Sequence, residues 1–176
     1  NEFYKRQDFH GVEIAQGLLQ KAIELDDNLI KAKVLLSNTY REMGEKDKSM
    51  EIDLNTLKQA EGIGDDIGVG YVLINIAKNH DWDDTTLYYL NRSYERFKEI
   101  DDKQGMSTVI NYIGNYYSLI GDLDNASDYV NYSLELSEKL EDKHGIAASL
   151  VGLGWFNYQR GDYKEALPYF NRAIRI

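Results

Sequence analysis

The chain has 176 residues, no cysteine and a formal net charge of −10 at pH 7. The lack of cysteine excludes a disulfide framework and a cysteine zinc cluster. No apolar run approaches the about 18 residues of a membrane-spanning helix. The Lys and Arg residues are dispersed and do not form the clustered basic face that binding to nucleic acid or to an anionic membrane surface requires. We therefore expect a cytoplasmic location, with neither nucleic acid nor a membrane as a partner.

The chain opens with one amphipathic segment. In residues 11–26 apolar side chains recur at i, i+3 and i+4, among them Ala15, Leu19 and Ala22, and this spacing predicts a helix. We interpret residues 1–28 as a half-repeat, with the opening NEFYKRQDF as the tail of a first helix. Because the chain starts without methionine and stops at Ile176 inside a helical pattern, we expect it to be a piece of a larger protein.

A first full repeat is predicted at residues 29–68. Its two helices lie near 29–43 and 46–62 and are separated by Gly44, a residue that readily ends a helix. Lys33 and Asp53 occupy positions that are apolar in the other copies. These two charged residues predict a loosely packed outer repeat.

Three further repeats follow, at residues 69–105, 106–145 and 146–176. The second is three residues short where its helices join, around His80 to Asp84. Its first helix is therefore expected to end early, or its turn to tighten, with Trp82 filling the altered space. Pro168 falls inside the last predicted helix, where it should bend the helix at modest cost.

The repeats are recognised by spacing. Gly154-x6-Gly161-Asp162 matches Gly114-x6-Gly121-Asp122 forty residues upstream, and the position of Gly154 and Gly114 is taken by Ala77 and Ser37 in the earlier copies. Small residues at these places let two helices approach closely, while large residues on the partner fill the space. A period of this length predicts a solenoid of helix pairs, because one pair cannot bury its own apolar face.

The last copy resembles the tetratricopeptide repeat. The pattern L-G-x6-G-D-Y-x2-A-x3-F-x2-A is present at Leu153-Gly154, Gly161-Asp162-Tyr163, Ala166, Phe170 and Ala173. This resemblance implies an all-α fold, a right-handed α-α superhelix of about 4.5 helix pairs. The period of forty residues is similar to that of the long-repeat variety of the family.

No motif for catalysis, a metal or a cofactor is recognisable. Asp122 begins an acidic cluster, but a calcium loop that started there would need Gly at its sixth position and Glu at its twelfth, and these positions are Ser127 and Ser133. His10, His80 and His144 fall in different repeats and do not form a metal-binding pair, and no nucleophile elbow or phosphate-cradling loop is present. We expect no enzyme activity, no metal and no cofactor.

The family resemblance implies a binding surface. In tetratricopeptide proteins the first helix of each repeat lines a concave groove, and the matching positions carry amides, aromatic rings and a few cations. Carried over by register, the predicted groove residues are Lys31, Asn38, Arg41, Tyr71, Asn75, Lys78, Trp82, Asn111, Tyr112, Asn115, Trp155 and Tyr158. Val34 and Ile74 stand where a terminal-carboxylate clamp would carry its first lysine, which argues against that subtype.

Two functions remain open. The first is a non-enzymatic protein-interaction module that binds a peptide or a partner helix in the groove, since amides can bond a peptide backbone and aromatic residues dominate interface energies. The alternative is self-association through exposed terminal helices, giving a structural homo-oligomer, or regulation of an attached signalling domain such as a cyclase, a kinase or a transcription regulator.

Overall fold

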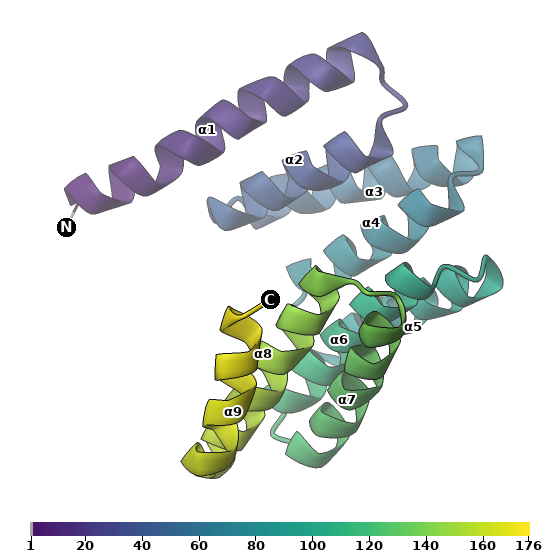
Figure 1. The fold of residues 1–176 in the computed structure, drawn as a ribbon. Coiled ribbons are helices and arrows are strands. Elements are labelled where there is room, and N and C mark those ends of the chain that lie inside the picture. The colour runs from purple at the N-terminus through teal and green to yellow at the C-terminus, as the bar shows by residue number, and fades with distance from the viewer. Residues whose placement is uncertain (1) are drawn as a thin grey trace. The chain divides into compact units, whose positions relative to one another are not determined.

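The computed structural model describes the backbone of residues 2–176 and the side chains from His10 onward (Figure 1). Within these residues every regular element is an α-helix, as predicted for an all-α solenoid. The helices are α1 (Glu2–Leu25), α2 (Ile30–Glu42), α3 (Lys46–Ile63), α4 (Asp66–Asn79), α5 (Asp84–Glu99), α6 (Lys103–Leu119), α7 (Leu123–Lys139), α8 (Lys143–Arg160) and α9 (Tyr163–Ile174).

The chain forms two compact units. The first ends at Asp81 and contains α1 to α4, and the second runs from Trp82 to Ile176 and contains α5 to α9. In the first unit α1 packs on α2, α3 packs on both α2 and α4, and α2 also contacts α4. Because α1 is unbroken from Glu2 to Leu25, the segment before Gly11 continues this helix and is not the tail of a separate one.

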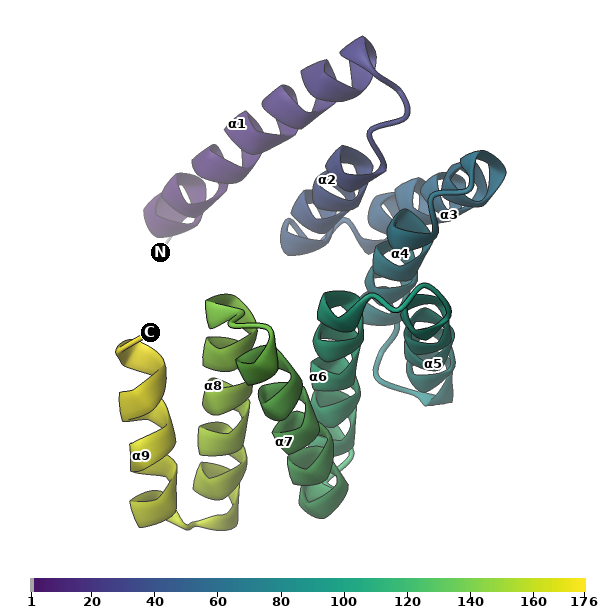
Figure 2. The ribbon, with the colours of Figure 1, turned by 45° about the vertical axis from the view of Figure 1, so that its right-hand side comes forward.

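The second unit repeats the same packing. Each helix packs on the next one in the chain, from α5 to α9, and the first helices α6 and α8 also touch each other (Figure 2). This order of contacts is that of stacked helix-turn-helix pairs. Ala126 and Val130 of α7 meet Leu153 and Phe156 of α8 in a buried cluster that joins the third pair to the fourth.

Glycine turns close three of the four pairs. Gly44, Gly121 and Gly161 have φ angles of 82°, 86° and 87°, a left-handed conformation that is costly for residues with a Cβ atom. The second pair has no such glycine, and its α4 is 14 residues long against 17 for α6. The first helix of this pair therefore ends early, which was one of the two predicted outcomes. The role of Trp82 as a filler stays a prediction; this residue is half-buried and has a φ of 60°.

The turns between pairs are built differently. Gly64 has a φ of 71°, but the corresponding turns before α6 and α8 place Asp101 and Glu141 in the left-handed region, at 55° and 54°. The next residues, Asp102 and Asp142, cap the following helices. The Asp102 carboxylate accepts hydrogen bonds from the backbone N–H groups of the first turn, which offsets the unpaired donors of a helix start.

Small residues at the predicted positions allow close helix contact. A Cβ atom on Gly114 would lie 2.4 Å from Val130 Cγ2 and 3.1 Å from the backbone oxygen of Ala126, and one on Gly154 would lie 2.8 Å from the Phe170 ring. The Val130 side chain of α7 therefore packs directly on the backbone of α6 at Gly114, and the Phe170 ring of α9 packs directly on the backbone of α8 at Gly154. Tyr163 differs from the expected interlocking role, since it remains 63% exposed.

Among residues 2–176 no helix combines the length and the apolar character that a membrane span requires.

Candidate partner-binding site

The first unit contains an open hollow of about 520 Å³ between α1, α2 and α4, which we call the first hollow. Its apolar wall consists of Ala15, Leu18 and Leu19 of α1 together with Leu35 of α2. Its polar part is organised by the Asn38 Oδ1 atom, which accepts hydrogen bonds from Arg41 Nη2 at 2.7 Å and from Lys78 Nζ at 3.2 Å. The lining residues are Ala15, Leu18, Leu19, Leu35, Asn38, Thr39, Arg41, Glu42 and Lys78.

A buried polar cluster supports this hollow. Asp53 of α3 is 0% exposed, and its two carboxylate oxygens accept hydrogen bonds from Asn75 Nδ2 at 3.4 Å and Asn79 Nδ2 at 2.9 Å. Asn79 also exchanges hydrogen bonds with Ser49, whose hydroxyl meets that of Ser37 at 2.9 Å. The prediction of a loose repeat around Asp53 is therefore wrong, because this polar residue is fully buried and bonded to α4.

Burial changes the charge balance of the first unit. Loss of hydration raises the pKa of Asp53 to about 6, although hydrogen bonds from Ser37 and Asn75 and the charges of Arg41 and Lys78 act in the opposite direction. Burial also lowers the pKa of Lys78 to about 8, helped by the nearby Arg41. Arg41 therefore stays positively charged at every pH of interest, whereas Lys78 loses its proton more readily than an exposed lysine.

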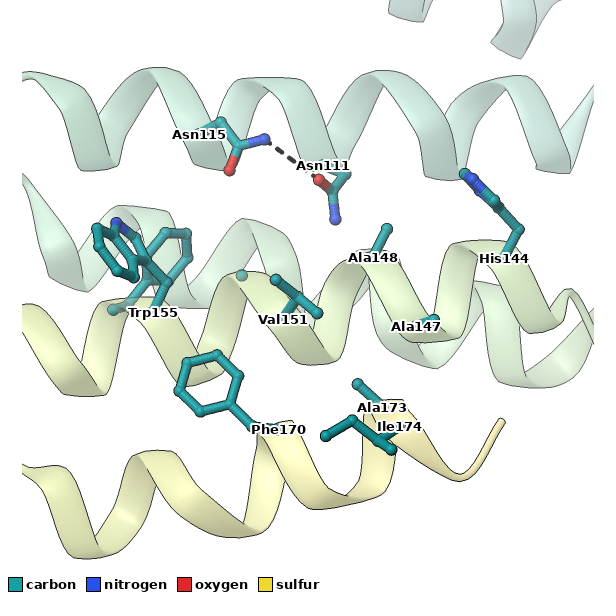
Figure 3. Close-up of a pocket in the computed structure, with 12 residues that line it drawn as sticks. Asn111, Asn115, His144, Ala147, Ala148, Val151, Trp155, Phe170, Ala173 and Ile174 are labelled. Carbon is teal, nitrogen blue, oxygen red and sulfur yellow. Dashed lines mark hydrogen bonds between the residues drawn. The ribbon is translucent and has the colours of Figure 1, made fainter. Parts of the chain in front are cut away.

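The second unit contains another open hollow, of about 620 Å³, formed by α6, α8 and α9 (Figure 3); we call it the second hollow. Its polar groups are two neighbouring amides on α6, where Asn115 Nδ2 donates to Asn111 Oδ1 at 3.4 Å. The rest of the lining is almost wholly apolar. It consists of Asn111, Asn115, His144, Ala147, Ala148, Val151, Gly152, Trp155, Phe156, Phe170, Ala173 and Ile174.

Buried hydroxyl groups orient the amides of the second hollow. Asn111 Nδ2 donates to Ser149 Oγ at 3.2 Å, and Ser149 Oγ donates to Ser133 Oγ at the same distance. Ser133 Oγ also donates to the backbone oxygen of Ser107 at 2.9 Å. This chain of bonds fixes the Asn111 amide with its oxygen toward Asn115, so Asn115 has its own oxygen left to present to the hollow.

Six of the twelve predicted groove residues line the two hollows: Asn38, Arg41 and Lys78 in the first, and Asn111, Asn115 and Trp155 in the second. Of the others, Tyr158 stacks on Trp155 with ring centroids 5.3 Å apart. Asn75 is buried, and its amide bonds the Val34 backbone oxygen and Asp53, so it supports the site instead of facing it. Lys31 is exposed, and Tyr71, Trp82 and Tyr112 are half-buried outside both linings.

Some lining residues were not predicted from the sequence. Leu18, Leu19 and Leu35 form the apolar wall of the first hollow, and Phe170, Ala173 and Ile174 of α9 form one side of the second. Their apolar character marked them as core residues, and nothing in the spacing showed that part of each side chain stays accessible. Among the described residues no group of His, Asp and Glu side chains is arranged to hold a metal ion.

The family scan matches residues 106–176 to the model described as a tetratricopeptide repeat. No curated protein matches the sequence. Among solved structures, BtubC (BKLC) from P. vanneervenii has a TM-score of 0.70 and 23% identity, over 97% of this chain and 74% of that one. A Rap protein complexed with Competence and Sporulation Factor has a TM-score of 0.79 and 14% identity, over 98% of this chain and 50% of that one.

A third structure, a thermophilic tetratricopeptide protein from Thermus thermophilus, has a TM-score of 0.64 and 15% identity, over 98% of this chain and 86% of that one. At these identities the likeness concerns the fold alone. Together with the family match, the likeness confirms the resemblance found in the sequence, while membership of the long-repeat variety stays a prediction. Residues 106–176 therefore match the tetratricopeptide-repeat model, and the chain as a whole shares the fold of these solved structures.

Proposed function

We propose that this chain is a non-enzymatic protein-interaction module that binds segments of a partner protein in its two hollows. The tetratricopeptide fold is that of an interaction module. The observation that carries the finer proposal is the convergence of Asn38, Arg41 and Lys78 in one hollow and of Asn111, Asn115 and Trp155 in the other.

The second hollow suits a neutral segment with an apolar side chain. Its lining contains no Asp, Glu, Lys or Arg, and Val151 and Trp155 are each about half exposed. An apolar group placed against them would lose water-exposed surface at about 25 cal/mol per Å². The amides of Asn111 and Asn115 supply donors and acceptors of the kind that pair with a peptide backbone.

The first hollow suits a segment with an apolar residue next to a polar or acidic one. Leu18 and Leu35 are exposed and offer the apolar contact, while Arg41 and Lys78 meet at Asn38. An acidic group reaching Asn38 could form charge-assisted hydrogen bonds with the Arg41 guanidinium, which are stronger than bonds between neutral groups. Glu42 at the edge of the same hollow would disfavour a ligand with several acidic groups.

One of the similar structures supports a binding role: the Rap protein was solved in complex with Competence and Sporulation Factor. The present chain covers half of that protein, and the likeness concerns the fold. The complex therefore supports the class of function proposed here, while the identity of the partner has to come from experiment.

The test compares a site variant with a matched surface variant. The site variant carries Asn38→Ala, Lys78→Ala and Asn115→Ala. The control carries Asn91→Ala, Lys58→Ala and Asn131→Ala, which remove the same side chains from exposed positions on α5, α3 and α7. Partners are recovered from lysate, identified by mass spectrometry and titrated as purified proteins, while light scattering reports molar mass.

The proposal expects the site variant to lose a partner that the control retains, with no change in mass. The loss should be at least about tenfold in affinity, since removal of a few central interface groups commonly costs more than 1.4 kcal/mol. Equal binding by both variants would overturn the proposal. Unchanged partners together with an altered molar mass would instead favour self-association.

A further inference from the structure

Lys78 is a half-buried lysine whose amino group lies at an open hollow. Its neighbours in the chain, Ala77 and Asn79, are both buried. The Lys78 side chain lines the first hollow, where its Nζ atom donates to Asn38 Oδ1 at 3.2 Å. The amino group is therefore withdrawn from bulk water but stays within reach of a small molecule that enters the hollow.

The charged groups around Lys78 come from α2 and α3. On α2, Arg41 donates to the same Asn38 oxygen at 2.7 Å, and Glu42 lines the hollow. On α3, Asp53 is fully buried. Because Lys78 and Arg41 meet on one oxygen atom, each disfavours the charge of the other. The lining residues that α1 contributes are all apolar: Ala15, Leu18 and Leu19.

This environment favours the neutral amine of Lys78. Loss of hydration lowers its pKa from 10.5 to about 8, and the charge of Arg41 acts in the same direction, while the charges of Asp53 and Glu42 oppose both. At pH 7.5 about a quarter of the Lys78 amines are then neutral, against about 0.1% for a lysine in water. Only the neutral form has a lone pair that can attack an electrophile. Burial together with a neighbouring cation is a general way to activate a lysine as a nucleophile.

Two exposed lysines of the second unit have the opposite environment. Lys103 and Lys139 donate hydrogen bonds to the carboxylates of Asp101 and Glu135, and these bonds raise the pKa of both lysines. Their amino groups are more accessible than that of Lys78 but retain their protons more firmly. They therefore provide internal references that separate the effect of the neutral amine from the effect of access.

The first hollow can also hold a short acyl group beside Lys78. It has a volume of about 520 Å³, and its leucine side chains would take up the carbon chain with a loss of exposed apolar surface. Arg41 can donate to the carbonyl oxygen or to an anionic leaving group, where negative charge grows as the amine attacks. The hollow thus combines an amine, an apolar wall and a fixed cation.

We propose that Lys78 is a modification site at which an activated short-chain acyl compound, either an acyl phosphate or an acyl thioester, forms an amide with the Nζ atom. The Nζ lone pair attacks the carbonyl carbon and a C–N bond forms. The C–O bond to phosphate, or the C–S bond to the thiol, breaks, and the leaving group departs with the bonding electron pair. The amine gives one proton to the solvent, and the side chain loses its charge.

Acylation would change what the first hollow can bind. Arg41 would be left as the cation on Asn38, and the acyl chain would cover part of the leucine wall. An acidic segment should then bind less tightly, a consequence that rests on the proposed function. The acylation itself needs no partner protein, so it can be tested without one.

The test measures acetylation at each lysine. The full chain reacts with acetyl phosphate, or with the thioester S-acetyl-N-acetylcysteamine, from pH 6.5 to pH 10, and peptide mass spectrometry gives the rates. Nα-acetyl-lysine amide serves as the model amine. Lys78 should react about tenfold faster than this amine at pH 7.5, because its lower basicity and partial burial offset most of the about 200-fold gain in neutral amine. The reagent with the larger ratio identifies the source of the acyl group.

The pH profile is the second readout. The rate at Lys78 should reach half its maximum near pH 8, whereas the rate of the model amine should still rise at pH 10. Lys103 and Lys139 should react more slowly than Lys78 at pH 7.5, although they are exposed. In urea Lys78 should react at the rate of the model amine, because the unfolded chain no longer shields it from water.

Two variants should act in opposite directions. Arg41→Gln removes a cation that disfavours the charged amine, so it should slow the acetylation of Lys78 at pH 7.5 and move the midpoint to higher pH. Asp53→Asn removes a charge that favours the charged amine, so it should accelerate the reaction. Lys103 and Lys139 lie in the other unit and should react as before in both variants. A general loss of structure would not change the rate at Lys78 in both directions.

Three results would overturn the inference. The first is acetylation of Lys78 no faster than that of the model amine at pH 7.5 with either reagent. The second is a Lys78 rate that has the same pH profile as the model amine, or that urea leaves unchanged. The third is a change of the same sign in Arg41→Gln and Asp53→Asn. Because no partner enters the assay, failure of the proposed binding function would not alter any of these outcomes.

Discussion

Asp53→Asn should stabilise the protein at pH 8, although it alters a fully buried and hydrogen-bonded residue. Burial raises the pKa of Asp53 from 3.8 to about 6, so the folded state disfavours its charged form. Each pKa unit corresponds to about 1.4 kcal/mol, which makes the cost of the ionised carboxylate about 3 kcal/mol. Asparagine loses one of the two hydrogen bonds from Asn75 and Asn79, at about 1 kcal/mol, and the net gain is about 2 kcal/mol.

The effect has a defined pH dependence. A carboxyl group with a raised folded pKa binds more protons in the folded state than in the unfolded state between pH 3.8 and about 6. The contribution of Asp53 to stability therefore falls as pH rises through this window, and the penalty is complete above it. The advantage of Asp53→Asn should be largest at pH 8 and should disappear on acidification to about pH 4, where Asp53 is neutral in the folded protein and about half protonated in the unfolded chain.

The assay is urea unfolding followed by far-ultraviolet circular dichroism from pH 4 to pH 8, for the wild-type chain and the variant in parallel. Subtracting the two curves removes the contribution of all other carboxylates. Hydrogen exchange of α2, α3 and α4 shows whether the change arises in the first unit. The reasoning would be refuted by a variant that is less stable than the wild type at pH 8, or by a difference that does not vary with pH.

The remaining predictions concern helix contacts, caps and one lysine. Gly114→Ala should lower the free energy of unfolding by about 1–3 kcal/mol, because the new Cβ would meet the buried Val130 and a backbone oxygen. Gly154→Ala should lower it by less, because the half-buried Phe170 ring beside it can move. The urea midpoints of the two variants test this order. Asp102→Ala should cost about 1 kcal/mol through the lost cap, whereas Asp162→Ala should cost less, because that carboxylate accepts no capping bond; equal losses would contradict this. Lys78 has a pKa lowered from 10.5 to about 8, so stability should rise with pH between these values, and Lys78→Met should remove that part of the rise in thermal melts at pH 7.5 and 9.5.

The sequence predicted the structure correctly at positions where the local conformation or a close helix contact requires one particular type of residue. Gly44 was predicted to end a helix, and Gly121 and Gly161 were predicted to occupy equivalent positions of the repeat; all three have the left-handed conformation that favours glycine. Counting residues against the other copies predicted either an early end of α4 or a tighter turn after it, and the structure has the early end. Gly154 was predicted as a helix-contact residue because a small residue recurs at this position in every copy, and the structure places it against Phe170.

The sequence was less informative where partners come from distant parts of the chain. Asp53 looked like a defect of the repeat, because its partners Asn75 and Asn79 lie on another helix and no local pattern links them. For the same reason Asn75 was predicted on the groove from its register alone. Register gives the side of the helix, but the hydrogen bond to Val34 and the resulting burial depend on how closely α4 packs on α2.

Asp101 and Glu141, which have left-handed backbone conformations, are positions at which substitution could raise the stability of the protein. Each holds a conformation that costs a non-glycine residue about 1 kcal/mol, and neither residue lines one of the two hollows. Replacing both with glycine would remove the backbone strain from the turns between helix pairs and would leave the side chains that line the hollows unchanged. In this more stable background, variants with substitutions in the binding site would stay folded. A loss of affinity could then be separated from a loss of structure.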